Sequence, residues 1–264
     1  MATDHSFGTF AWMVLSTSDP VSAIDFYRRA LGWQDLPTPV ATMMVKSGRP
    51  VAAVMDYRKN DHIQKEPVNW LPMIRVRSID EATARVIELG GSVIVPGIDA
   101  GFGAAGAVRG VTGEAIGLWQ TPGSLGGDPI IMDPKVCGWF ELVTRDPERA
   151  RAFYRALFGW RIADEGGYTF IGNERGQFGG IVELAGDWED HAFLAAIGRA
   201  RGEKMRVPPH WMAFFSVEDC DAFADEAEEM GAQVTGRPEP LHTVGTFAVI
   251  RDPQGVYFSV LSKR

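Results

Sequence analysis

Two carboxylates and one imidazole in the second half of the chain have the chemistry of a general acid–base site. Glu141, Glu183 and His210 lie in segments with strand-like patterning, and the alternation of side chains along strands predicts that they face one cavity. Burial raises the pKa of a carboxylic acid, and a second acid nearby raises it further, so these groups could transfer protons without a metal. We therefore predict that they are catalytic. The competing interpretations are structural ion pairs of the carboxylates with Arg145 or Arg175, and an ordinary loop role for the histidine.

Aromatic and apolar side chains are predicted to line this cavity and a similar one in the first half of the chain. Stacking on an indole is worth about 0.5–1.5 kcal/mol beyond the burial of its area, so such a lining suits a small, partly aromatic ligand. The competing interpretation is that the inward Trp side chains only fill the core. The predicted ligand-binding residues are Trp12, Asp56 and Trp119 in the first half and Trp139, Met212, Phe214, Tyr257, Ser259 and His242 in the second.

These residues belong to a duplicated chain. Residues 10–33 align without a gap to residues 137–160, at a constant offset of 127 that pairs Asp19 with Asp146. In both copies a strand-like segment leads to Asp-Pro. This pair predicts the start of a helix, because the Asp carboxylate can accept from the free backbone N–H groups of the first turn, and Pro has no N–H at a position where none is needed. An apolar stripe follows, and Gly-Trp ends the helix. A repeat of this length indicates a tandem duplication.

Each half of the chain contains the same order of elements twice. A predicted strand is followed by a helix and then by three strands, which gives four βαβββ units and an α+β fold class. The segment 122–133 is rich in Gly and Pro, which predicts a linker. We therefore expect one domain over residues 1–121 and a second over residues 134–264.

The motifs within these units resemble those of a known family. Four units, with Asp-Pro opening helices that contain Phe-Tyr and end in Gly-Trp, and with Asp252-Pro-Gln-Gly255 before the last strand, resemble the vicinal oxygen chelate superfamily. This is the group of glyoxalases, bleomycin-resistance proteins and extradiol dioxygenases, and the likeness is closest to its two-domain bacterial branch described as glyoxalase-like or hydroxylase. The resemblance implies that paired units curl into two half-open barrels around ligand cavities. The tetrapeptide at 252–255 is predicted to be a turn only.

The resemblance also implies where a divalent metal would be held in this family. Its ligands are His or Gln on a first strand, Glu on a last strand, and the matching positions of the partner unit. Only Asp56 and Glu183 keep a carboxylate that could bind a metal in this way. This gives one carboxylate per cavity, whereas such metal sites use at least three protein ligands. We therefore expect no cofactor and no tightly held metal. The alternative left open is a divalent cation that binds weakly at Glu183. The ligand positions themselves fall on Trp12, Leu71, Gly117, Trp139, Met212 and Ser259.

Composition narrows the classes of partner. The chain of 264 residues is 45% hydrophobic and 23% charged, as in globular proteins, and its net charge of -8 without charge runs disfavours nucleic acid and anionic membranes. No apolar run has the length of a membrane span or a signal core, so we expect a cytoplasmic protein. Cys137 and Cys220 have no metal-site spacing and are predicted to be reduced and buried. We expect a small-molecule ligand and a monomer or homodimer.

Three functions are consistent with the sequence. The leading hypothesis is a protein that binds a small apolar or aromatic molecule in Trp-lined cavities without a tightly held metal. The second is an enzyme of the glyoxalase or dioxygenase type, acting as a lyase, isomerase or hydroxylase in the second-domain cavity. The third is an interaction or scaffold protein whose cavities are filled by the Trp side chains. The fold alone does not choose among them.

Overall fold

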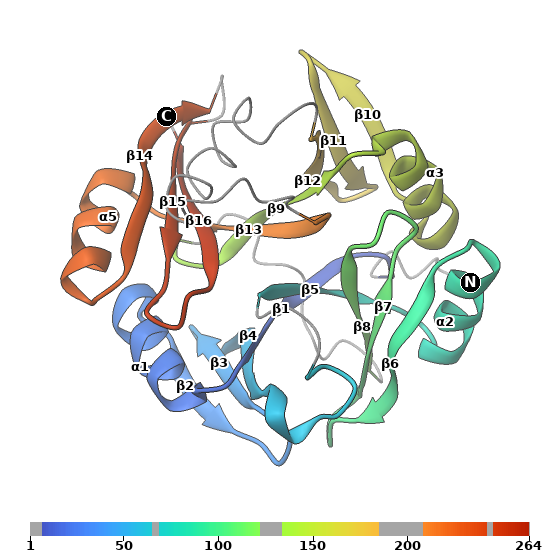
Figure 1. The fold of residues 1–264 in the computed structure, drawn as a ribbon, viewed down its shortest axis with the longest axis horizontal. Helices are drawn as coiled ribbons and strands as arrows, with labels where there is room; N and C mark the ends of the chain where they lie inside the picture. Colours follow the sequence, from blue (N-terminus) through green and yellow to red (C-terminus); the bar gives the residue numbers. More distant parts are fainter. Residues whose placement is uncertain (1–6, 65–68, 122–133, 185–207, 242–244, 264) are drawn as a thin grey trace.

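The computed structural model describes residues 7–64, 69–121, 134–184, 208–241 and 245–263. These form two eight-stranded sheets, each with two helices, and Figure 1 shows the two sheets with their helices on the outside. One sheet uses strands between residues 10 and 120, and the other uses strands between residues 137 and 263. The expected α+β class with paired βαβββ units is confirmed. The predicted linker at 122–133 lies outside the described residues.

The first sheet has the strand order β2-β3-β4-β1-β5-β8-β7-β6, so its two units meet where β1 pairs antiparallel with β5. Strand β1 also pairs parallel with β4, and β5 with β8, as the repeat of one unit requires. The elements are β1 (Phe10–Thr17), α1 (Pro20–Leu31), β2 (Gln34–Pro37), β3 (Thr42–Lys46), β4 (Arg49–Asp56), the short 3-10 helix η1 (Tyr57–Lys59), β5 (Trp70–Arg75), α2 (Ile79–Glu88), β6 (Ser92–Asp99), β7 (Ala104–Arg109) and β8 (Ala115–Gln120).

The second sheet repeats this arrangement in the order β10-β11-β12-β9-β13-β16-β15-β14. Strand β9 lies at its centre, antiparallel to β13 and parallel to β12. The elements are β9 (Cys137–Thr144), α3 (Pro147–Phe158), β10 (Arg161–Glu165), β11 (Tyr168–Asn173), β12 (Gly176–Glu183), β13 (His210–Ser216), α5 (Cys220–Glu229), β14 (Gln233–Leu241), β15 (Gly245–Arg251) and β16 (Tyr257–Lys263).

Local sequence explains where the repeated helices begin and end. Asp19 caps α1, because its Oδ1 accepts from the backbone N–H of Ser22 at 3.1 Å. Asp146 caps α3 in the same way. Gly32 and Gly159 end the two helices with φ of 68° and 69°, a left-handed conformation that other residues adopt only with strain.

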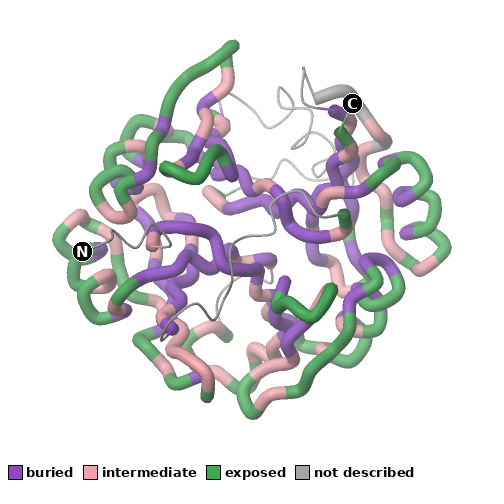
Figure 2. The backbone as a smooth tube through the Cα atoms, turned by 180° about the vertical axis from the view of Figure 1, so that it is seen from behind, coloured by how far each residue is buried: buried purple, intermediate pink, exposed green. Residues whose placement is uncertain are grey.

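The two faces of each sheet have different neighbours. On β1, Met13 and Leu15 are fully buried and pack with Tyr27 of α1, whereas Trp12 belongs to a separate cluster on the opposite face. This alternation follows from the two-residue period of a strand. Figure 2 shows the buried residues concentrated in the central strands, with the exposed sides of the helices at the rim. The cavities described below lie on the Trp12 side.

A continuous apolar core joins the two sheets, and buried tyrosines cross it. The Tyr27 hydroxyl on α1 donates to Asp252 Oδ2 at 2.8 Å, and the Tyr154 hydroxyl on α3 donates to Glu114 Oε1 at 2.6 Å. Burial, and then the adjacent carboxylate, raise the pKa of both tyrosines. The tetrapeptide at 252–255 is therefore more than the predicted turn, because its Asp252 carboxylate anchors a helix of the other half.

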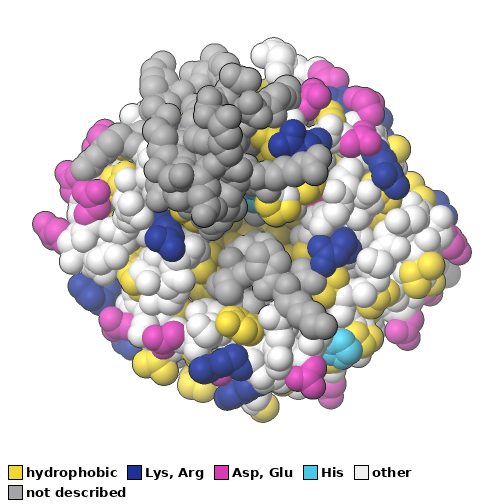
Figure 3. Space-filling view, viewed as in Figure 1, with side chains coloured by type: hydrophobic (Ala, Val, Ile, Leu, Met, Phe, Trp, Pro, Cys, Tyr) yellow, Lys and Arg dark blue, Asp and Glu magenta, His cyan; other side chains and the backbone are white. Residues whose placement is uncertain are grey.

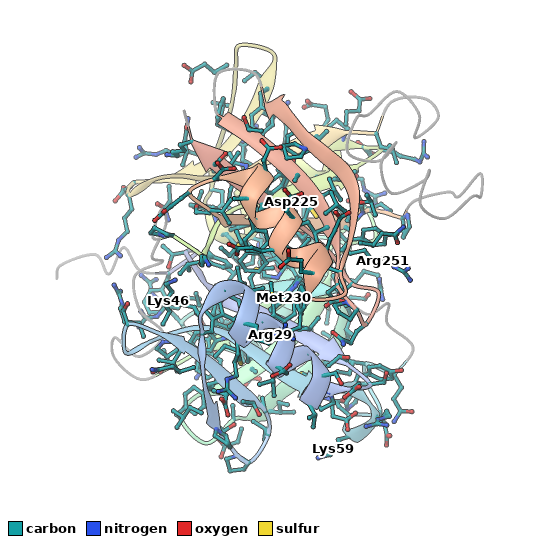
Figure 4. The ribbon with its side chains drawn as sticks, turned by 90° about the vertical axis from the view of Figure 1, so that its left-hand side faces the viewer. Arg29, Lys46, Lys59, Asp225, Met230 and Arg251 are labelled. Atoms are coloured by element: carbon teal, nitrogen blue, oxygen red, sulfur yellow. The ribbon has the colours of Figure 1, made fainter. Side chains whose placement is uncertain are left out.

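The tryptophans that follow the helices make the same kind of link. Trp33 Nε1 donates to the carbonyl oxygen of Lys135 at 2.7 Å, and Trp160 Nε1 donates to that of Gly8 at 2.6 Å. Helices α1 and α5, which come from different halves, lie side by side in Figure 4. The buried core and these paired bonds fix one half against the other.

The sequence also leads to predictions about the helices and the two cysteines. Among the helices of the described segments, none combines the length and the apolar content needed to cross a bilayer. Cys137 and Cys220 are buried and free, as predicted.

Candidate functional site

The first sheet carries a cavity of about 110 Å³ on its Trp12 face. Trp12 and Trp119, both predicted to bind ligand, form one wall with ring centroids 4.5 Å apart, and Phe102 lies 5.3 Å from Trp119. Both indoles are almost completely buried, so their orientation is fixed by packing. Small apolar side chains and thioethers complete much of the wall: Val14, Ala41, Met43, Ala53, Met55 and Leu71.

Asp56, the third residue predicted for this cavity, does not lie in it. Ala53 and Met55 line the cavity, so strand alternation directs Asp56 to the opposite face of β4. There its Oδ1 accepts from the backbone N–H and Nε of Arg58, at 3.0 and 2.9 Å, and caps η1. Hydrogen bonds from the Arg58 side chain lower the pKa of this carboxylic acid. The predicted ligand-binding placement of Asp56 is therefore wrong, and its role is to hold the turn after β4.

The matching face of the second sheet carries a short chain of hydrogen bonds between side chains. Trp139 Nε1 donates to the Tyr168 hydroxyl at 3.1 Å, and that hydroxyl donates to Glu141 Oε1 at 2.5 Å. Phe170 packs against Tyr168 with ring centroids 4.8 Å apart. Glu141 is buried and Tyr168 is half-buried, so the tyrosine hydroxyl covers the carboxylate.

A glycine on the intervening strand makes this contact possible. Gly180 of β12 pairs with Glu141 of β9, and a Cβ at Gly180 would lie 1.9 Å from the Tyr168 hydroxyl. Any side chain there would displace the ring. Tyr168 and Gly180 were not predicted as site residues, although the repeat carried a signal for the pair. At the offset of 127, Glu141, Tyr168 and Gly180 correspond to Val14, Ala41 and Ala53 of the first-domain cavity.

Burial raises the pKa of Glu141 from its ordinary value of 4.5 to about 7. The hydrogen bonds from Tyr168 and Trp139 act in the opposite direction, because they favour the charged form, but they only partly offset the loss of hydration. Burial, and then the neighbouring carboxylate, raise the pKa of Tyr168 far above its ordinary value, so its hydroxyl stays protonated. Glu141 is thus a carboxyl group that changes charge near neutral pH, with a hydroxyl donor in contact.

Other residues predicted for the second cavity lie on the same face. Met212 pairs with Glu141 across β13 and β9, Phe214 pairs with Trp139, and both side chains are buried against that indole. Tyr257 packs against the same cluster. Ser259 of β16 is fully buried, and its Oγ has no hydrogen-bond partner among the described residues. The predicted apolar lining is therefore assembled, with one buried hydroxyl in it.

Glu183 and His242 are not brought to this group. Ile181 packs into the core between the sheets, and alternation places Glu183 on that same face of β12, where its side chain is exposed. The prediction that Glu183 faces the cavity beside Glu141 is therefore wrong. His242 lies outside the described residues.

His210 lies beside a space between the two halves. This space of about 310 Å³ is lined by Pro208, Pro209 and His210 of the second half and, among others, by Tyr57 and Arg109 of the first. His210 Nδ1 is 2.9 Å from the carbonyl oxygen of Pro208, which holds the ring in place. The predicted catalytic histidine therefore lines the space between the halves, and its position opposite Val143 puts it on the same face of the second sheet as Met212.

The side chains at the family's metal-ligand positions do not fit a metal. In the first sheet, Trp12 fills one of these positions and Gly117 has no side chain. In the second, Met212 of β13 and Ser259 of β16 lie on the same face of the sheet as Trp139. Among the described residues no group of three or more His, Cys, Asp or Glu side chains is arranged to hold an ion. We therefore derive no chemistry through a metal at these positions.

Comparison with known proteins shows similarity over the whole chain. Residues 137–260 match the family model described as Glyoxalase/Bleomycin resistance protein/Dioxygenase superfamily. A Mycobacterium tuberculosis protein named "Putative glyoxylase CFP32" is 32% identical, over 98% of this chain and 96% of its own length. The "Anthracycline biosynthesis protein DauV" of Streptomyces sp. is 31% identical, over 97% of this chain and 94% of its own.

Solved structures share the fold at low sequence identity. The Mn(II)-bound glyoxalase from Novosphingobium aromaticivorans matches with a TM-score of 0.63 at 13% identity, covering 97% of this chain and 82% of that one. The 2,3-dioxygenase LapB from Pseudomonas sp. KL28 matches with a TM-score of 0.63 at 12% identity, covering 97% and 93%. These likenesses show the arrangement of the two sheets and nothing about the reaction.

Proposed function

The chain belongs to the glyoxalase/bleomycin resistance protein/dioxygenase superfamily, and from this premise we propose that it binds a small apolar or aromatic molecule without a tightly held metal. The ligand occupies the first-domain cavity, between Trp12 and the side chains of β3 and β4. The observation that carries this proposal is the open cavity itself. At the same place in the second domain, Tyr168 covers Glu141.

The chemistry of the wall supports an aromatic ligand. Trp12, Trp119 and Phe102 offer ring faces and edges, and Met43 and Met55 supply polarisable thioethers that adapt to ring shape. The Trp119 indole N–H is buried without a hydrogen-bond partner among the described residues. A ligand that presents an acceptor to this group would remove the cost of leaving a donor unpaired.

The names of the Streptomyces relatives are compatible with this class of ligand, because they place those proteins in anthracycline biosynthesis. Anthracyclines are fused-ring aromatic compounds. We infer from these names only the class of ligand for this chain, which is a planar and largely apolar molecule.

Filling the cavity tests the proposal. Ala41→Phe introduces a ring at the position that Tyr168 holds in the second domain, and we expect it to abolish the tryptophan-fluorescence change caused by aromatic ligands. Tyr168→Ala is the matched control, because it opens the second-domain position and leaves the first-domain cavity unchanged. Loss of binding in the control, with binding retained in Ala41→Phe, would refute this location. A stoichiometric metal in extensively dialysed protein would refute the absence of a tightly held metal.

A second candidate function rests on Glu141. A carboxyl group with a pKa of about 7 in contact with a tyrosine hydroxyl suits proton transfer in an isomerase or lyase reaction. In this alternative the half-buried Tyr168 hydroxyl contacts the substrate, and Glu141 exchanges a proton with that hydroxyl.

Turnover measurements separate the two functions. The alternative predicts isomerisation of hemithioacetals of methylglyoxal, and Glu141→Gln should reduce this turnover by at least about 100-fold. The exposed Glu183→Gln is the control and leaves turnover unchanged. Equal activity in the Glu141→Gln variant and the original protein would exclude this role.

A further inference from the structure

We propose that the ligand of the first-domain cavity also carries an anionic group, such as a carboxylate, which lies between the two halves beside Arg109. The inference rests on the proposed function, since it assumes a ligand in the first-domain cavity, and it specifies which class of aromatic molecule is bound. The space between the halves that contains Arg109 and His210 is named the vestibule below.

The vestibule adjoins the first-domain cavity. Both are lined by Ser16, Ile63, Leu71 and Ala107, so the two spaces share a wall. The cavity holds about 110 Å³ and the vestibule about 310 Å³, and the latter is the more polar of the two. A molecule with its ring in the cavity would therefore extend its polar end into the vestibule.

The charge of the vestibule favours an anion. Arg109 is half-buried there and supplies a permanent positive charge, and His210 lines the same space. None of the described residues that line the vestibule or the cavity is acidic, although the whole chain has a net charge of -8. On the face drawn in Figure 3, several Lys and Arg side chains lie near the hydrophobic atoms visible at its centre, and most Asp and Glu side chains lie toward its edge. Partial burial strengthens the attraction between a guanidinium and a carboxylate, because the local dielectric is lower than that of water.

The orientation of Arg109 is already fixed by the fold. Its Nη1 donates to the carbonyl oxygen of Gly113 at 2.8 Å, in the turn between β7 and β8. Less rotamer entropy is then lost when an anion binds. In the second domain, by contrast, a carboxylate ligand would meet the buried acid Glu141.

The duplication supplies a matched control residue. Arg109 ends β7 opposite Ala115, and Arg251 ends β15 opposite Tyr257, so the two arginines hold the same position in the repeat. Arg251 is exposed, stacks over the Tyr257 ring at 5.9 Å, and is labelled on the surface in Figure 4. A change at Arg251 removes the same charge from the chain and leaves the vestibule intact.

Binding of paired neutral and anionic probes tests the inference. The probes are carboxylates and carboxamides of one- to three-ring aromatics, for example 2-naphthoate and 2-naphthamide, measured by tryptophan fluorescence and calorimetry. We expect the carboxylate of the best-fitting pair to bind about tenfold more tightly than its carboxamide, because a hydrogen bond to a charged group is worth about 1.5–3 kcal/mol. Arg109→Gln removes this preference and leaves carboxamide affinity unchanged. Arg109→Lys restores part of the preference, and Arg251→Gln preserves all of it.

The outcomes separate this inference from the proposed function. Equal affinity for both members of every pair, or a preference that survives Arg109→Gln, would overturn the inference and leave the aromatic cavity as proposed. Binding of neither member of any pair would overturn both. Circular dichroism and urea unfolding of each variant show that a lost preference is measured on folded protein.

Discussion

Replacement of Glu141 by Gln should change how stability depends on pH. The pKa of Glu141 is about 7 in the folded protein and close to 4.5 when the chain is unfolded. Between these values the folded state binds more protons than the unfolded state, so the free energy of unfolding decreases as pH rises. The destabilisation is complete above the folded pKa and absent below the unfolded pKa. A difference of 2.5 pKa units at 1.36 kcal/mol per unit corresponds to about 3 kcal/mol.

Gln keeps the shape of the side chain and an oxygen that accepts from the Tyr168 hydroxyl, but it does not ionise. The difference in unfolding free energy between the Glu141→Gln variant and the original protein should therefore increase by about 3 kcal/mol, in favour of the variant, as the pH rises from 4.5 to 8. Urea unfolding followed by circular dichroism at half-unit pH steps measures this difference, in which all other titrating groups cancel. Glu183→Gln is the control, because Glu183 is exposed, and its difference should stay within about 0.5 kcal/mol across the range. If the Glu141→Gln difference were equally flat, the burial argument for this carboxyl group would be wrong.

Three further changes test the packing that holds the sites. Tyr27→Phe removes the hydroxyl that bonds to buried Asp252 and should lower the unfolding free energy by about 1–3 kcal/mol, measured by urea unfolding; a neutral effect would show that water replaces the hydroxyl. Gly180→Ala places a methyl group against the Tyr168 hydroxyl and should also destabilise by about 1–3 kcal/mol, with loss of the near-ultraviolet dichroism of that ring; an unchanged spectrum would contradict the close contact. Asp19→Ala removes a helix cap and should lower the unfolding free energy by about 0.5–2 kcal/mol, measured from the folding and unfolding rates in a chevron plot; unchanged rates would show that the cap contributes nothing.

Five placed residues show where strand alternation gives a correct prediction and where it fails. The alternation correctly places Trp12, Trp119 and Trp139 on one face of their sheets, because a buried residue precedes each of them and none is the last residue of its strand. It fails for Asp56 and Glu183, which come last in β4 and β12. A one-residue error in phase moves a side chain to the other face of a sheet, and a polar strand end has little apolar pattern to fix that phase.

The sequence by itself determines the duplication, the order of elements and the helix ends, because these depend on residues close together in the chain. Asp19 and Gly32 act within their own helix, so their roles are readable from spacing alone. The residue types at the family's metal-ligand positions, which are Trp, Leu, Gly, Met and Ser, can likewise be read from the sequence.

Tertiary structure decides what the cavities contain, because their residues meet across strands and across halves. Tyr168 reaches Glu141 only because Gly180 lies on the strand between theirs, and His210 lines one space with Arg109 only because the second half packs on the first. Such contacts depend on sheet register and on the core that joins the halves, and neither has a local signal in the sequence. For the same reason, the corresponding faces of the two repeated sheets differ: the first carries an apolar cavity, while the second places a protonatable acid under a tyrosine.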